Sequence, residues 1–129
     1  MVYYDETIVR QFYEAFNRGD LTLVSKLYSE DVVLYVPGRS RISGIYRGKE
    51  ALHKLWEKQF ELSERTFRPE VVTVADGGGH IVVISDIRIL RAGREYAWRR
   101  VIDFRMQESR VKEAWFYEGN QYTADEAFA

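Results

Sequence analysis

Hydrophobic and polar residues alternate along residues 94–107, and this pattern predicts a long β-strand. Tyr96, Trp98, Arg100, Ile102, Phe104 and Met106 share one face, and the residues between them are mostly polar. A period of two places alternate side chains on opposite faces of a sheet. The segment is roughly twice the usual strand length of about 5–6 residues. We therefore expect it to twist and bend into a strongly curved sheet with a concave face.

Other segments rich in β-branched and aromatic residues also predict strands. These are residues 31–36, 66–76, 80–90 and 110–118, and a short strand is expected at 42–46. Glycine-rich or polar turns separate consecutive segments at residues 77–79, 92–93 and 108–109. The second half of the chain is therefore expected to form consecutive antiparallel strands.

Three segments in the N-terminal half carry apolar residues at helical spacing. Asp5 is the expected N-cap of the first helix, and Gly19 ends it. Asp20 caps a short second helix, and Gly48 opens the third. The inward faces are Ile8, Val9, Phe12, Tyr13 and Phe16 in the first helix, Leu21, Val24, Leu27 and Tyr28 in the second, and Leu52, Leu55, Trp56, Gln59 and Phe60 in the third. This order predicts the α+β class, with three helices on the concave face of the sheet.

The strand at residues 80–90 is largely apolar on both faces. Helices can cover only its concave face, so a partner subunit on the convex face is the expected solution. The sequence thus predicts a homodimer. The alternative is that this aliphatic surface is tolerated in water.

Composition narrows the range of functions. The chain has 129 residues, which predicts one domain over residues 1–129, and 46% of them are hydrophobic, enough for a core. A net charge of −1 gives no basic surface for nucleic acid or membranes. There is no cysteine, and two distant histidines, His53 and His80, lack metal-binding spacing, so no cofactor or metal is expected. Without a signal peptide or membrane span, we expect a cytoplasmic protein.

Several motifs are typical of one superfamily. They are Val9-Arg-Gln-Phe-Tyr-Glu-Ala-Phe-Asn-Arg-Gly-Asp-Leu, Leu27-Tyr-Ser-Glu-Asp-Val, Gly44-Ile-Tyr-Arg-Gly-Lys-Glu-Ala-Leu, Arg110-Val-Lys-Glu-Ala-Trp and Asn120-Gln-Tyr-Thr-Ala-Asp-Glu-Ala-Phe. In these the chain resembles SnoaL-like and ketosteroid-isomerase-like proteins of the nuclear transport factor 2-like superfamily. The resemblance implies a cone-shaped, cystatin-like α+β roll, a deep pocket and a dimer. It leaves the activity open, because such cones carry enzymes and non-catalytic binding modules.

The resemblance also implies where acid–base residues would lie. The ketosteroid isomerase base position falls on Val36, the tyrosine on Phe12 and the acid on Ile102. All three are apolar here, and Asp103, one residue out of register, is expected to face outward. Proton abstraction by that route is therefore not expected.

An apolar, aromatic cavity remains, as is typical of a small-molecule site. Its predicted lining is Phe12, Phe16, Val36, Leu52, Leu55, Trp56, Ser85, Ile87, Ile89, Trp98, Arg100, Ile102, Phe104 and Phe116. Arg100 is its one charge, either a clamp for a ligand carboxylate, enolate or carbonyl, or half of an internal ion pair, for instance with Glu113. Hydrophobicity does not settle whether Glu113 and Trp115 or Ala114 and Phe116 face inward.

Three functions follow in order of preference. The first is binding of a small hydrophobic molecule in the cavity. The second is an enzyme of the polyketide cyclase, isomerase or lyase type, acting on a carbonyl compound with Arg100 and Glu113 as catalytic residues. The third is a non-catalytic protein-association domain.

Overall fold

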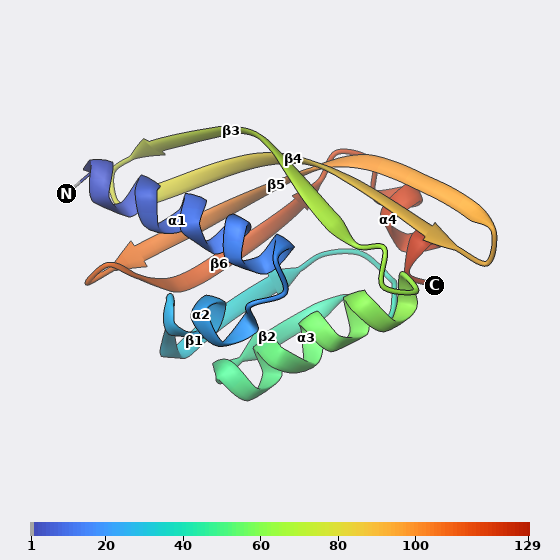
Figure 1. Cartoon of the computed structure of the whole chain (residues 1–129), viewed down its shortest axis with the longest axis horizontal. Helices are drawn as coiled ribbons and strands as arrows, with labels where there is room; N and C mark the ends of the chain where they lie inside the picture. Colours follow the sequence, from blue (N-terminus) through green and yellow to red (C-terminus); the bar gives the residue numbers. More distant parts are fainter. Residues whose placement is uncertain (1) are drawn as a thin grey trace.

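The computed structural model describes the backbone of residues 2–129 and the side chains from Asp5 onward (Figure 1). Within these residues, four helices and six strands follow one another. They are α1 (Val2–Asn17), α2 (Leu21–Lys26), β1 (Tyr28–Val36), β2 (Gly44–Arg47), α3 (Gly48–Leu62), β3 (Arg68–Gly77), β4 (His80–Arg91), β5 (Arg94–Gln107), β6 (Arg110–Glu118) and α4 (Gln121–Ala127). None of the helices within residues 2–129 is long and apolar enough to cross a membrane.

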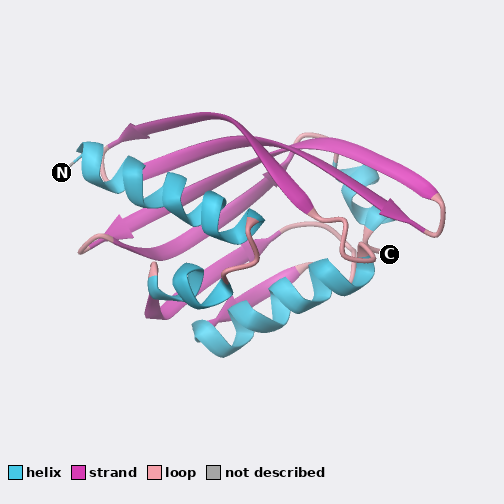
Figure 2. Ribbon diagram, in the orientation of Figure 1, coloured by secondary structure: helices cyan, strands magenta, loops and turns pink. Residues whose placement is uncertain are grey.

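The six strands form one curved sheet in the order β2-β1-β6-β5-β4-β3. β1 and β6 run parallel, and every other neighbouring pair is antiparallel. The sheet is mixed and does not close, because β2 and β3 are its edges. α1, α2 and α3 lie over its concave face (Figure 2). The predicted α+β class and the helix-covered curved sheet are confirmed.

The helix boundaries follow local chemistry with two corrections. Gly19 ends α1 with φ +81°, a conformation that glycine adopts without strain. Asp20 caps α2, since its Oδ1 accepts a hydrogen bond from the Leu23 N–H at 3.1 Å. The expected N-cap role of Asp5 is wrong, because α1 already begins at Val2. Tyr28 also leaves the predicted second helix and opens β1, although it stays buried.

β6 contains an irregularity that decides which of its side chains face inward. Hydrophobicity alone left that question open. Near its turn, Met106 pairs with Val111, but the next pair is Arg105 with Glu113. Lys112 is therefore an extra residue in β6, a β-bulge that shifts which side chains face the core. Beyond it, Ala114 and Phe116 are buried, and Glu113, Trp115 and Tyr117 lie on the convex face.

The C-terminal segment forms a helix, α4, that was not predicted from the sequence. Asn120 caps α4 by accepting a hydrogen bond from the Thr123 N–H at 3.1 Å. Phe128, which follows α4, is fully buried, with ring centres 5.8 Å from Trp98 and 6.2 Å from Phe67. α4 therefore closes one end of the aromatic core.

Candidate functional site

Arg100 lies on the concave face of β5, as predicted. Its direct cross-strand partner is Glu118 of β6. Nε donates to Oε1 at 2.8 Å and Nη2 to Oε2 at 2.9 Å, and the two side chains are only 3% and 2% exposed. This two-pronged geometry is the strong form of an arginine–carboxylate pair. The internal ion pair expected for Arg100 exists, but its partner is Glu118 and not Glu113.

The remaining surroundings of Arg100 are one amide and several rings. Nη1 donates to Oε1 of the buried Gln59 on α3 at 3.1 Å. The guanidinium carbon lies 4.9 Å from the ring centre of Phe116 and 5.5 Å from that of Phe67. The positive charge is thus neutralised by one carboxylate within an aromatic enclosure.

Glu113 lies on the opposite face of the sheet. Arg105 donates to its Oε1 from Nε at 2.7 Å, and the Tyr35 hydroxyl donates to Oε2 at 3.4 Å. The ring of Tyr35 stacks on Trp115 at 5.0 Å between ring centres. Arg100 and Glu113, predicted together as catalytic candidates, therefore do not form one site.

A small cavity lies between the sheet and the helices. Eight of its lining residues belong to the predicted set: Phe12, Phe16, Trp56, Ser85, Ile87, Arg100, Ile102 and Phe116. The other predicted residues, Val36, Leu52, Leu55, Ile89, Trp98 and Phe104, are buried in the core but do not line it. Residues not predicted there are Tyr13, Tyr28, Leu34, Gln59, Phe67 and Pro69. Of these, Gln59 had a signal in the sequence, a polar residue on the inward face of its helix.

The cavity volume is about 30 Å³. That is room for roughly one or two groups the size of a water molecule. It is far below the roughly 300–1,000 Å³ of ordinary small-molecule pockets. Aromatic side chains thus fill most of the predicted hollow.

Tyr13 is the polar residue of α1 at this cavity. It is 4% exposed, and its hydroxyl has no hydrogen-bond partner among the described residues. Burial raises the pKa of Tyr13 well above its usual value, and the positive charge of Arg100 acts in the opposite direction without cancelling that shift. The hydroxyl therefore stays protonated and can donate a hydrogen bond.

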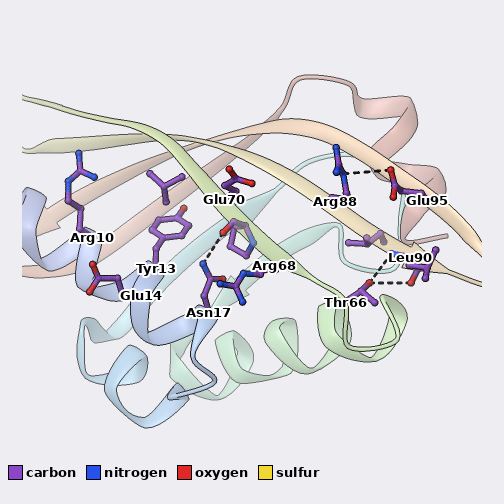
Figure 3. A pocket seen from close by; sticks show the side chains of 13 residues that line it. Arg10, Tyr13, Glu14, Asn17, Thr66, Arg68, Glu70, Arg88, Leu90 and Glu95 are labelled. Carbon is purple, nitrogen blue, oxygen red and sulfur yellow. Dashed lines mark hydrogen bonds and ion pairs between the residues drawn. The ribbon is translucent and has the colours of Figure 1, made fainter.

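An open groove of about 740 Å³ lies outside the cavity, between α1 and the strands β3 and β4 (Figure 3). Tyr13 and Pro69 line both the groove and the cavity. Asn17 ties the two sides together, because its Nδ2 donates to the carbonyl oxygen of Pro69 at 2.9 Å. Tyr13 and Pro69 therefore lie between the two spaces.

The positions that the family resemblance singled out are apolar and buried. Phe12, Val36 and Ile102 all belong to the core. Asp103 lies on the convex face as expected, where its Oδ1 is 2.6 Å from Nδ1 of His80. Among the described residues, no group of three or more histidine, aspartate or glutamate side chains could hold a metal ion.

The curved open sheet, its helical cover and the enclosed aromatic interior define an α+β protein with the cystatin-like fold. Residues 9–114 match the SnoaL-like domain, and the chain belongs to this family. An uncharacterized protein of Mycobacterium tuberculosis (strain ATCC 25618 / H37Rv) is 26% identical over 99 residues, 76% of each chain.

Two solved structures have the same fold. Bal32a, from a soil-derived mobile gene cassette, superposes with a TM-score of 0.95 at 26% identity, covering 99% of this chain and 98% of that one. TerC, co-crystallized with polyporic acid, has a TM-score of 0.86 at 12% identity, covering 97% of this chain and 98% of its own. The second likeness concerns the fold alone.

Proposed function

We propose that this protein binds a small, largely apolar and uncharged molecule through a hydrogen-bond acceptor such as a carbonyl oxygen. The observation that carries the proposal is the Tyr13 hydroxyl, a buried donor without a partner among the described residues. Leaving such a group unpaired costs about 1–3 kcal/mol. A ligand acceptor at the cavity removes that cost.

The charges at the cavity favour a carbonyl over the other expected ligand groups. Arg100 is already matched by Glu118. A bound carboxylate or enolate would leave a net negative charge in an apolar enclosure, which is strongly unfavourable. A neutral carbonyl oxygen can accept from Tyr13 without adding any charge.

A matched series of naphthalenes tests this proposal. Isothermal titration calorimetry would compare 2-acetylnaphthalene, 2-naphthoate and 2-ethylnaphthalene, which share the apolar body and differ in the polar group. We expect the ketone to bind about tenfold more tightly than the ethyl compound, the equivalent of about one hydrogen bond. Tyr13→Phe should remove that preference. Tightest binding of 2-naphthoate, or no binding in the series, contradicts the proposal.

Catalysis on the same carbonyl is the second candidate. It is favoured by a carboxylate of the last strand, Glu118, bound to Arg100. Glu118 does not line the cavity, however, whereas a general base must reach the proton that it removes. Nuclear magnetic resonance can follow exchange of the acetyl protons of 2-acetylnaphthalene in deuterated water. Acceleration by the protein that is lost in a Glu118→Gln variant still folded by circular dichroism would establish catalysis, and absence of acceleration by the wild type leaves binding.

We further propose that two chains form a dimer through the convex face. Ile84, Val101 and Tyr117 lie in register across β4, β5 and β6 on that face. They are half-buried or exposed, and Trp115 lies on the adjacent row. A second copy would cover this apolar strip. The small volume of the cavity is also consistent with the third candidate function, a protein-association domain. That function predicts a dimer that binds none of the naphthalenes.

A further inference from the structure

The groove between α1 and β3 has the dimensions that the interior cavity lacks. We propose that the groove and the cavity are two compartments of one ligand site. The apolar body of the ligand occupies the groove, and its acceptor group passes Tyr13 into the interior. This inference rests on the proposed function and adds where the ligand enters and what its body contacts.

The sizes of the two spaces support this division. The cavity of about 30 Å³ admits a group as small as a carbonyl oxygen but no ring system. The groove of about 740 Å³ falls within the usual range of roughly 300–1,000 Å³ for small-molecule pockets. A ligand that reaches the Arg100 enclosure without displacing the aromatic core must therefore keep most of its volume in the groove.

The groove and the cavity also share part of their lining. Tyr13 and Pro69 border both spaces, so a ligand in the groove lies directly against the residue that carries the unpartnered hydroxyl. Asn17 adds a second polar atom at this boundary. Its Nδ2 must face the carbonyl of Pro69, so its Oδ1 points elsewhere and is buried without a partner among the described residues. A ligand hydroxyl could donate to that oxygen.

The groove itself selects an uncharged ligand with an apolar body. Its apolar lining comes from Tyr13, Pro69, Val71, Ile89 and Leu90. Its charged side chains are Arg10, Arg68 and Arg88 against Glu14, Glu70 and Glu95, so the two signs balance. Arg88 and Glu95 already pair at 3.6 Å. The positive and negative side chains therefore balance in both compartments. The ligand class that fits is a neutral ketone with an apolar body, with or without a hydroxyl group.

Two neighbouring valines provide a matched test. Val71 lines the groove, whereas Val72 does not line it and is 49% exposed. The binding of 2-acetylnaphthalene would be measured by calorimetry for the wild type, Val71→Trp and Val72→Trp, with folding checked by circular dichroism. Because a tryptophan at Val71 occupies part of the groove wall where the ligand body would lie, we expect it to weaken binding by about tenfold or more, and Val72→Trp by less than about twofold.

Wild-type affinity in a folded Val71→Trp variant overturns the groove assignment and leaves the proposed function intact. Absence of binding to the wild type removes the proposed function and this inference together. If Val71→Trp does not fold, Leu90→Trp takes its place, since Leu90 lines the same groove and is 46% exposed. The same loss of affinity is then expected, and unchanged affinity overturns the inference.

Discussion

Arg100 illustrates how one buried charge is accommodated in this fold. Three of its N–H groups bond to Glu118 and Gln59, and its guanidinium carbon lies over the rings of Phe116 and Phe67. Such a pair is stable only while both charges are present, because each desolvated ion depends on the other. A loss of function after removal of Arg100 would therefore mix a lost ligand contact with a damaged core.

Removal of Arg100 alone should destabilise the protein strongly. Arg100→Met leaves Glu118 buried and unpaired, and we expect it to lower the free energy of unfolding by about 3–5 kcal/mol. The double variant Arg100→Met, Glu118→Leu should recover most of that loss. Urea unfolding followed by circular dichroism measures both. A double variant no more stable than the single one would show that the pair is not the source of the cost.

Tyr13 should make the protein sensitive to alkaline pH. Its folded-state pKa is raised above the value of about 10 of an exposed tyrosine. The corresponding stability is fully present below about pH 10 and is lost as the pH rises further, since the unfolded chain ionises first. In Tyr13→Phe, the free energy of unfolding should fall less steeply with pH than in the wild type between about pH 9 and 11.5. The difference between the two slopes should reach up to about 1.4 kcal/mol per pH unit.

Tyr122→Phe is the control for this measurement, because Tyr122 is 90% exposed. It should leave the pH dependence unchanged. At pH 7, Tyr13→Phe should unfold at the same or a higher urea concentration than the wild type, since it removes an unpaired buried hydroxyl. A loss of more than about 1 kcal/mol at pH 7 would show that the hydroxyl is satisfied in the folded protein.

At the scale of single elements, the bulge in β6 separates what the sequence predicts from what it does not. β5 was predicted with its observed bounds and with Arg100 on the inner face, because a long alternating pattern has only one consistent register. In a regular two-residue hairpin, Glu113 would lie on the same face as Arg100. The extra Lys112 reverses this and brings Glu118 opposite Arg100. A one-residue insertion of this kind leaves no mark in hydrophobicity.

The end of β6 depends on a close backbone approach at Gly119. Its N–H donates to the carbonyl oxygen of Arg99 at 2.6 Å, and a Cβ on Gly119 would lie 2.8 Å from that oxygen. Gly119→Ala should therefore push the strand end away and displace Glu118. We expect a loss of about 1–3 kcal/mol in the free energy of unfolding.

Gly77→Ala is the matched control, because a Cβ there has no atom within 4 Å and Gly77 has no positive φ. It should change stability by less than about 0.5 kcal/mol. Thermal unfolding monitored by circular dichroism compares the two variants. Equal effects at Gly77 and Gly119 would show that the approach to Arg99 carries no constraint.

The candidate site was only partly predictable for a related reason. Alternation on β4 and β5 identifies the inward residues Ser85, Ile87 and Ile102, but not how far the opposite helices reach into the hollow. Tyr13 looked like a core residue because it extends the aromatic stripe of α1. That its hydroxyl lacks a partner, and that rings leave only about 30 Å³ of space, depend on three-dimensional packing.

At the scale of the whole molecule, the proposed dimer predicts that a charge on the convex face separates the subunits. Val101 lies in register between Ile84 and Tyr117 on that face. Val101→Lys should convert a dimer to a monomer, because an unpaired charge is costly in the centre of an interface. Val72→Lys, on the edge strand β3, should leave the dimer intact. Size-exclusion chromatography with light scattering gives the masses, and a monomeric wild type at micromolar concentration contradicts the dimer.

The molecule as a whole combines three features. Its interior is packed with aromatic rings, the buried charges of Arg100 and Glu118 neutralise each other there, and an open groove lies beside this interior. These features belong together if a neutral ligand reaches Tyr13 from the groove. A crystal structure of the protein with 2-acetylnaphthalene is the most direct measurement. We predict the carbonyl oxygen within about 3 Å of the Tyr13 hydroxyl, with the Arg100–Glu118 pair intact. A probe bound elsewhere, or a carbonyl that displaces Glu118 from Arg100, would contradict this account.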